Sequence, residues 1–317
     1  MMISGFTMAR NAESLYYPIA ESISSILPIV DEFVVALGEG SPGDRTRELI
    51  EGIGSPKIRI IDTVWDTDAF RNGTEHAHQT DIAMRECSGD WLFYLQADEV
   101  VHEEDHGAIL ERCAELQDDR EVDGLLFDYL HFWGDYDHVH RSHGWYLHEI
   151  RIVRNDPEIH SWESAQSFRR IPDFDGRSYR QKEGSEKLRV APANARIFHY
   201  GWVRPPDFMR RKHRAFDSIH HGEDEAARRH AAEVGNYDYG PLGRIPQFTG
   251  THPAVMAGKI EAFDWGEQLN YSGRLGRPER PLHKHERTRY RLLSGIERVF
   301  NGGREIGGFR NYILLDR

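Results

Sequence analysis

The chain has 317 residues, of which 39% are hydrophobic, 29% charged and 11% aromatic, and its formal net charge is −12. This composition is typical of a globular protein with a sizeable core, and the length predicts one or two domains. The longest apolar run is five residues, far short of the ~20 that a membrane span needs, and the acidic balance argues against a general nucleic-acid binder.

The two cysteines, Cys87 and Cys113, both fall in helical patterns. They are typical of small core residues in a reduced compartment. No charged start followed by an apolar segment and a small-residue cleavage site is recognisable, so no signal peptide is predicted. We therefore expect a cytoplasmic protein.

Residues 2–96 alternate between strand and helix patterns. Asp44 is a good N-cap for the second helix. The alternation predicts an α/β fold with a parallel sheet and helices on both faces, and buried parallel strands are indeed continuous apolar runs. The predicted strands cover residues 2–7, 32–37, 57–63 and 91–96, and the predicted helices cover residues 11–26, 44–50 and 76–87.

Beyond residue 105 the rhythm changes. The segments 155–187 and 222–285 are polar or irregular and are expected to be mostly loop. Strands are predicted at 124–132, 146–154 and 195–200, and helices at 107–116, 207–221 and 286–300.

In open α/β sheets, ligands bind beyond the carboxyl ends of the strands. The apolar run 91–95 is followed at once by Gln96, Asp98 and Glu99. Acids at the end of a buried strand are costly unless they bind something, and a divalent cation is the natural partner of their oxygens. The alternative is that these acids favour the start of the next helix. By the same rule, the segments 7–13, 38–44 and 65–73 are the other expected ligand-binding loops.

Residues 88–99, SGDWLFYLQADE, resemble the "GDW…DADE" segment of family-2 glycosyltransferases with the GT-A fold. The resemblance is strongest to the bacterial branch that builds lipopolysaccharide cores and surface glycans. It covers about residues 2–215 in two blocks, and further matches fall in the family's order: residues 3–7 with Arg10 and Asn11, residues 31–35 with the turn 40–46, and residues 198–201.

The resemblance implies a GT-A fold with a mostly parallel central sheet, and transfer of a sugar from a nucleotide-diphosphate donor to a glycan or lipid-linked acceptor. It implies a donor half over 1–105, a half completing the acceptor and metal sites over 106–222, and a C-terminal extension over 223–317. Asp98 and His199 would hold Mn²⁺ or Mg²⁺. The expected donor-binding residues are Thr7, Arg10, Asn11, Glu39, Asp44, Arg71, Gln96 and Asp98.

The chain also departs from the family pattern. Gln96 stands in place of the first acid of D-x-D, which leaves Asp98 as the carried-over metal carboxylate, and Asp81 stands where the family has Asn. The acid that contacts uridine has no clean match, so Glu39 and Asp44 are only candidates for it.

The chemistry expected of such a site is consistent with these residues. A divalent ion stabilises charge that builds on the leaving diphosphate, and the sugar passes through an oxocarbenium-like state. An inverting enzyme also needs a carboxylate base. Glu163 lies near the position of the related enzymes' acid and is the predicted base, although a direct match would place Gln166 there. Glu149 and Asp128 are further candidates, and a solvated loop acid is the alternative.

Two other functions remain open. His102, Glu103 and His106 form a literal H-E-x-x-H, which on a continuous helix would place two imidazoles and a base as in a zinc metallopeptidase. The motif falls at a helix start, and Gly107 follows it, which argues against that function. A non-catalytic sugar-binding module on the same fold is the second alternative, and Gln96 favours it.

Two segments are candidates for acceptor and surface contacts. The histidine-rich segment 131–148 carries Trp133 and Trp145, which we expect to stack on an acceptor sugar unless the loop is merely solvated.

Residues 271–317 have a net charge of +6, from 11 Lys or Arg against 5 acids. Their helical pattern predicts peripheral contact with the inner membrane face or a partner, and packing on the acidic body is the alternative. The predicted helix combines four basic with five apolar residues: Arg287, Arg289, Arg291 and Arg298 with Leu292, Leu293, Ile296, Val299 and Phe300.

Overall fold

The fold is described from a computed structural model of the chain, for all residues except 141, 232–234, 275–277, 279, 301–305 and 308–309. Four parallel strands form its N-terminal half in the order β3-β2-β1-β4. Their bounds are Ile3–Ala9 for β1, Glu32–Gly38 for β2, Ile58–Thr63 for β3 and Trp91–Tyr94 for β4.

Helices cover both faces of these strands, because successive side chains of a strand point to opposite faces. Phe33 and Val35 of β2 join the core cluster that contains the apolar residues of α1, whereas Val34 and Ala36 join the cluster that contains those of α3. The helices are α1 (Ile19–Ile26), α2 (Thr46–Glu51) and α3 (Thr74–Arg85).

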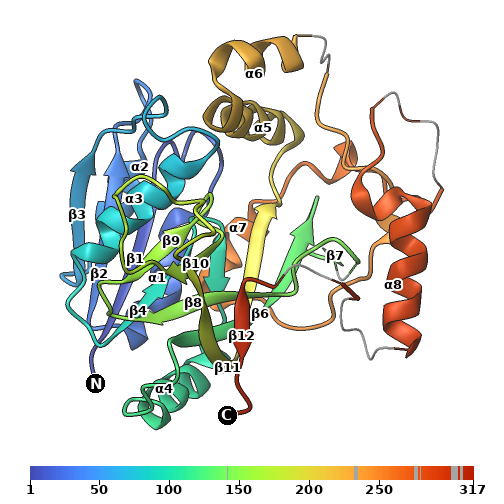
Figure 1. Cartoon of the computed structure of the whole chain (residues 1–317). Coiled ribbons are helices and arrows are strands. Elements are labelled where there is room, and N and C mark those ends of the chain that lie inside the picture. Colours follow the sequence, from blue (N-terminus) through green and yellow to red (C-terminus); the bar gives the residue numbers. More distant parts are fainter. Residues whose placement is uncertain (141, 232–234, 275–277, 279, 301–305, 308–309) are drawn as a thin grey trace.

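The second half continues the same sheet. β8 pairs antiparallel with β4 and β6, and β6 pairs parallel with the long β11, so the predicted α/β fold with a mixed, largely parallel sheet is confirmed. Each of the three predicted parts of the chain, 1–105, 106–222 and 223–317, contributes at least one strand to this one sheet (Figure 1). The further strands are β5 (Glu99–Val101), β6 (Gly124–Trp133), β7 (Val139–His140), β8 (His148–Arg154), β9 (Ile159–Trp162), β10 (Ser167–Arg170), β11 (Glu186–Trp202) and β12 (Tyr312–Leu314).

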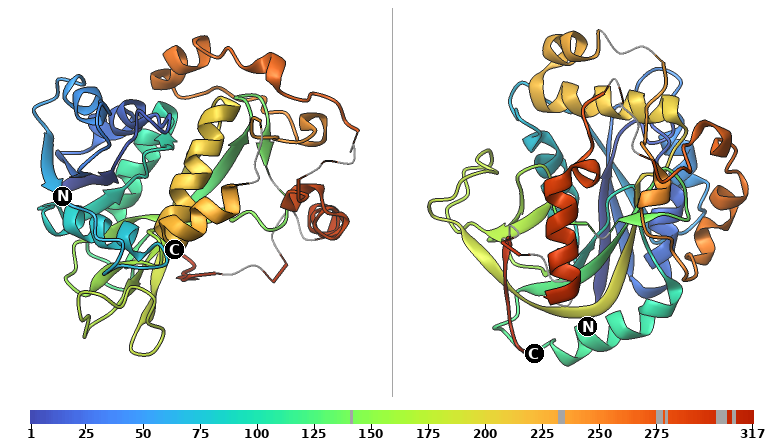
Figure 2. Two further views of the ribbon diagram at one scale, coloured as in Figure 1. Left: turned by 90° about the horizontal axis from the view of Figure 1, so that it is seen from above. Right: turned by 90° about the vertical axis from the view of Figure 1, so that its right-hand side faces the viewer.

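The remaining helices flank the sheet. Seen from above in Figure 2, α5 lies between the N-terminal half and the C-terminal segment that carries α8. None of the described helices combines the length and apolar character that crossing a membrane requires. Their bounds are His106–Glu115 for α4, Pro206–His221 for α5, Glu223–His230 for α6, Ala257–Glu261 for α7 and Thr288–Phe300 for α8, with short 3₁₀ turns at Leu27–Ile29, Glu103–Asp105, Leu242–Arg244, Ala254–Met256, Gly266–Gln268 and Lys284–Glu286.

Two sequence-based expectations need correction. The helix predicted over 11–26 begins only at Ile19, because Pro18 disfavours helical backbone in the residue before it and residues 11–17 form turns instead. The segment 155–187, expected to be loop, contains the hairpin β9–β10. Each of its strands is four residues long, too short for a period-two pattern to stand out.

Candidate functional site

A cavity of about 950 Å³ opens at the carboxyl ends of β1 and β4. The chain moves outward from β1 to β2 and β3 on one side, and β4 lies on the other, so the strand order reverses here. Such a switch point is where ligands bind in open α/β sheets. The volume lies within the range of small-molecule sites. Arg10, Asn11, Gln96, Asp98 and His199 all line the cavity.

Asp98 and His199 meet although about 100 residues separate them. β5 pairs antiparallel with β11 so that Glu99 lies opposite His199, and the backbone N–H of Tyr200 donates to the carbonyl of Asp98 at 2.8 Å. Both side chains are buried, and His199 Nε2 lies 3.8 Å from Asp98 Oδ1. The strand pairing therefore produces the close approach that the sequence predicted.

A chain of hydrogen bonds fixes the tautomer of His199. The Tyr146 carbonyl can only accept, so His131 Nε2–H donates to it at 2.7 Å and His131 Nδ1 is left as an acceptor. His199 Nδ1–H must then donate to His131 Nδ1 at 2.9 Å. Burial lowers the pKa of His131 to about 4 and holds the pKa of His199 well below its usual range, so both rings are neutral.

The result is an unprotonated His199 Nε2 facing a carboxylate oxygen. Two acceptors at this separation repel unless a cation or a donor lies between them. Metal-binding histidines commonly donate their second ring N–H to a neighbour, as His199 does to His131. The donor set of one imidazole and one carboxylate suits Mn²⁺ better than Mg²⁺, which prefers oxygen ligands.

The backbone of Gly201 packs directly against these two side chains. A Cβ at this position would lie 2.5 Å from His199 Nε2 and 2.8 Å from Asp98 Oδ2. Within the described part of the chain, no three His, Cys, Asp or Glu side chains are grouped to hold a metal. Asp98 and His199 therefore offer two ligands, and any further ligands would have to come from a bound substrate and water.

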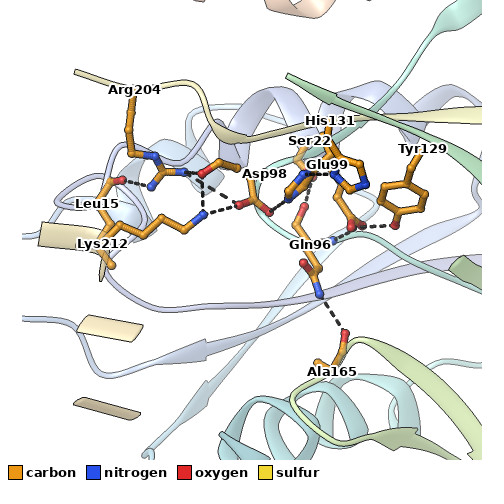
Figure 3. Close-up of polar contacts among 12 residues, drawn as sticks. Leu15, Ser22, Gln96, Asp98, Glu99, Tyr129, His131, Ala165, Arg204 and Lys212 are labelled. Atoms are coloured by element: carbon orange, nitrogen blue, oxygen red, sulfur yellow. Dashed lines mark hydrogen bonds and ion pairs between the residues drawn. The ribbon is translucent and has the colours of Figure 1, made fainter. Parts of the chain in front are cut away.

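Two cations hold the other oxygen of Asp98. Lys212 Nζ donates to Asp98 Oδ2 at 3.1 Å and to the Gly201 carbonyl at 2.7 Å, and an Arg204 guanidinium nitrogen lies 3.9 Å from the same oxygen. Figure 3 shows Lys212 and Arg204 on one side of the carboxylate and His131 on the other. Burial alone would raise the pKa of Asp98, but the positive charges of Lys212 and Arg204 lower it to about 2. Burial lowers the pKa of Lys212 to about 8.

The neighbouring acid Glu99 has a structural role. Arg151 donates to both of its carboxylate oxygens at 2.7 Å, and the Tyr129 hydroxyl donates to one of them at 2.8 Å. Glu99 and Arg151 are fully buried. The Gln96 side chain donates to the Ala165 carbonyl at 2.9 Å, which ties the end of β4 to the β9–β10 turn. Of the two acids after β4, only Asp98 lines the cavity.

Arg10 and Asn11, two of the predicted donor-binding residues, line the cavity near the end of β1. The Arg10 guanidinium lies 5.4 Å from the centre of the Trp65 ring, and its Nε donates to the Glu39 carbonyl at 2.9 Å. Asn11 Oδ1 accepts from the Ser41 backbone N–H at 2.6 Å. Trp65 lines the cavity beside them, although the sequence analysis did not single it out.

Four of the donor-binding candidates, Thr7, Glu39, Asp44 and Arg71, do not line the cavity. The buried hydroxyl of Thr7 donates to the Leu95 carbonyl and ties β1 to the end of β4. The Asp44 carboxylate accepts hydrogen bonds from the backbone N–H and hydroxyl of Ser14 and from the backbone N–H of Thr46. It therefore links the loop after β1 to the start of α2. Glu39 and Arg71 are exposed, and Arg71 donates to the backbone of its own turn.

The predicted base Glu163 lies in the β9–β10 turn with left-handed backbone (φ 56°), and it is absent from the cavity lining, whereas Ser164 and Gln166 line it. Glu149 has a different environment. It lies on β8 and is likewise absent from the cavity lining. Its Oε2 is buried without a hydrogen-bond partner, and burial raises its pKa to about 7. Asp128 is exposed and lies against His148.

Another end of the cavity is aromatic, but Trp133, a predicted acceptor-binding residue, is not an exposed platform there. It is buried, its ring stacks on Trp202 with centroids 4.8 Å apart, and its Nε1 donates to the Tyr239 carbonyl. Trp145 lines the cavity and stacks on His140. No local sequence signal marks the other residues at this end, which come from distant segments: Trp202, His213, Tyr237, His283 and His285.

Several buried nitrogens at this end have no hydrogen-bond partner. They include Trp145 Nε1, His213 Nε2 and both ring nitrogens of His285. Burial lowers the pKa of His213 to about 4 and that of His285 to about 3, so both rings are neutral. Neutral imidazoles and an indole N–H among aromatic rings are suited to a polar, uncharged ligand such as a sugar.

The H-E-x-x-H motif does not form a metal site. His102 has extended backbone, and its Nδ1 accepts from the Glu104 N–H as a cap of the 3₁₀ turn. His106 Nε2–H donates to the Ser25 carbonyl at 2.7 Å. The two imidazoles therefore have separate structural partners, which removes the basis for the zinc metallopeptidase.

Comparisons with known proteins give structural likenesses only. No protein-family model and no curated protein matches the chain. Glucosyl-3-phosphoglycerate synthase from Mycobacterium tuberculosis, solved with Mn²⁺, uridine diphosphate and phosphoglyceric acid, is similar at 17% identity and TM-score 0.28, over 41% of this chain and 43% of the synthase. S. aureus TarS 1-349 is similar at 13% identity and TM-score 0.36, over 74% of this chain and 76% of that one. The match thus spans less than half of the synthase, and these likenesses are too low to assign a function.

Proposed function

We propose that this protein is a glycosyltransferase that moves a sugar from a nucleotide-diphosphate donor to an acceptor hydroxyl, with a divalent metal ion. The observation that carries the proposal is the unprotonated His199 Nε2 facing Asp98 at 3.8 Å in a cavity at the switch point of the sheet. Parallel strands, a basic donor end and an aromatic acceptor end are consistent with it. The resemblance of residues 88–99 to family-2 glycosyltransferases supports the same reaction.

In this proposal, Asp98 and His199 hold Mn²⁺ or Mg²⁺. The ion supplies Lewis-acid stabilisation of the charge on the leaving diphosphate. Lys212, fixed between Asp98 and the Gly201 carbonyl, adds a second positive charge at the same place. Arg10 and Asn11, at the end of β1, contact the nucleotide side of the donor.

The acceptor sugar would lie at the aromatic end, against Trp145 and Trp202, with the unpartnered nitrogens of His213 and His285 as hydrogen-bonding groups. Glu149 replaces Glu163 as our preferred base. A general base is most effective when its pKa lies near the working pH, and the pKa of Glu149 is raised to about 7. Asp98, with a pKa near 2, stays ionised. Two carboxyl groups with such different environments suit different roles.

The proposal is tested by thermal shift with a panel of nucleotide sugars, with Mn²⁺ and with EDTA. A ligand at ~100 times its dissociation constant should stabilise the protein by ~2.7 kcal/mol. His199→Gln should remove the metal-dependent part of this stabilisation. His102→Ala is the matched control and should leave the metal-dependent part of the stabilisation unchanged, because His102 lies outside the cavity lining.

A product assay then separates an enzyme from a sugar-binding module. Release of nucleoside diphosphate from the stabilising donor supports transfer, whereas stabilisation without any release supports the non-catalytic alternative. Nucleotide binding that is unaffected by EDTA would contradict the metal site.

A further inference from the structure

Helix α8 presents its apolar face to solvent. Leu292, Ile296, Val299 and Phe300 are 64%, 45%, 71% and 81% exposed. Their spacing of i, i+4, i+7 and i+8 places them on one side of the helix. α8 lies at the right-hand edge of the molecule in Figure 1 and faces the viewer in the right-hand view of Figure 2. An amphipathic helix normally buries this side, so α8 packs on the body of the chain without burying these four side chains.

Polar contacts fix the opposite side of α8 to the protein. Ser294 Oγ accepts from the His143 backbone N–H at 2.8 Å, and the buried Glu297 carboxylate lies 2.7 Å from His143 Nδ1. The Ile306 N–H also donates to Glu297 at 2.7 Å. The polar side is therefore the inward side, and the orientation of the helix is set by specific bonds.

Exposed arginines flank this apolar side, and Arg289, three residues before Leu292 and seven before Ile296, shares its face. Arg287, Arg289 and Arg291 are exposed, and the one acid in residues 287–300 is the inward-facing Glu297. Residues 271–317 have a net charge of +6 in a chain of net charge −12, so the remainder has a net charge of −18. An anionic surface would therefore repel most of the molecule and attract this segment.

We propose that α8 docks this apolar, arginine-flanked face on an anionic membrane surface. A helix of this composition lies in the interface with its apolar side among the headgroups and acyl chains, and basic residues add attraction to anionic lipids. A second copy of the chain is a poorer occupant. A two-fold contact would bring the same patch together and place arginines against arginines.

The docking would also orient the cavity. A Cβ on Gly144 would lie 2.8 Å from the Tyr290 ring of α8, so the loop that carries Trp145 packs directly against this helix. His285, which lines the acceptor end, comes just before α8 in the chain. Membrane docking would bring the acceptor end close to the lipid surface, where a lipid-linked acceptor would be found. This last step rests on the proposed function, whereas the docking does not.

The test is co-sedimentation of the full chain, without metal or nucleotide, with vesicles of phosphatidylcholine alone and with added phosphatidylglycerol. Wild type should bind the anionic vesicles preferentially. Leu292→Ser with Ile296→Ser should reduce binding about tenfold or more. Arg289→Gln with Arg291→Gln should reduce it about fivefold per arginine, and only on anionic vesicles. The controls are Val64→Ser, at another exposed apolar position, and Arg228→Gln with Arg229→Gln on α6.

Equal binding by wild type and the Leu292→Ser, Ile296→Ser variant, with both folded by circular dichroism, would overturn the proposal. A wild-type dimer in solution that the same variant dissociates, without vesicle binding, would also overturn it, because a second copy would then be the occupant. Neither result depends on whether a nucleotide sugar binds.

Discussion

Gly201 approaches His199 so closely that a Cβ on the glycine would lie 2.5 Å from His199 Nε2. The same atom would lie 2.8 Å from Asp98 Oδ2, so any side chain here would fill the space that both residues face. The backbone of residues 198–201 thus sets the site as firmly as its side chains do.

Gly201→Ala should therefore abolish metal-dependent nucleotide binding while both proposed ligands remain in place. Isothermal titration of Mn²⁺ with nucleoside diphosphate measures this loss. Gly107→Ala is the matched control, because a Cβ there meets nothing within 4 Å. Metal-dependent binding by Gly201→Ala at wild-type affinity would place the ion elsewhere.

Asp98→Asn should remove metal binding and also lower stability, because Lys212 and Arg204 would lose their carboxylate partner. The folded-state pKa of Asp98 lies below its unfolded value, so its contribution is present at neutral pH and is lost as the pH falls from about 4 towards about 2. The expected cost at pH 7 is about 2 to 3 kcal/mol. Denaturant unfolding should show a constant difference from wild type between pH 5 and 8 that shrinks below pH 4.

Glu149→Gln should show the opposite dependence on pH. The folded-state pKa of Glu149 is raised by burial, so its stability contribution is complete below about pH 4.5 and is lost as the pH rises through about 7. The variant should match wild type near pH 4.5 and be more stable at pH 8, by up to about 3 kcal/mol. Melting temperatures at the two pH values measure this.

The same variant tests the assignment of the base. Loss of a general base should lower kcat by about 100-fold or more. Glu163→Gln serves as the comparison, with no change expected in either stability or kcat. A large loss of kcat in Glu163→Gln alone would restore Glu163 as the base.

Glu99→Gln should be destabilising without changing the metal dependence. The variant removes the carboxylate that Arg151 contacts through two nitrogens, and breaking a buried ion pair from one side costs about 3 to 5 kcal/mol. Chemical denaturation measures the cost, and thermal shift with Mn²⁺ and nucleotide checks the site. Selective loss of metal binding at unchanged stability would make Glu99, too, a metal ligand.

The sequence predicted best where a signal is local. β2 and β4 contain continuous apolar runs, and Asp98 follows β4 closely. Gly201 and Lys212 have no such signal, because their role depends on β11 pairing with β5 and on α5 lying over the cavity. Thr7 and Asp44 belong to the segments 7–13 and 38–44, where ligands are expected to bind at the carboxyl ends of strands. A local pattern cannot distinguish a side chain that contacts a ligand from one that holds two loops together by hydrogen bonds.

The pairing of β12 with β11 has a practical consequence. Tyr312 lies opposite Leu188 in a parallel ladder, and Leu315 N–H donates to the Val190 carbonyl at 2.8 Å. Deleting the chain from α8 onward would strip this strand away and leave the backbone of residues 188–190 as an unpaired edge, which invites aggregation. A truncated protein that fails to bind vesicles would then report a damaged sheet, and an affinity tag is safer at the other terminus.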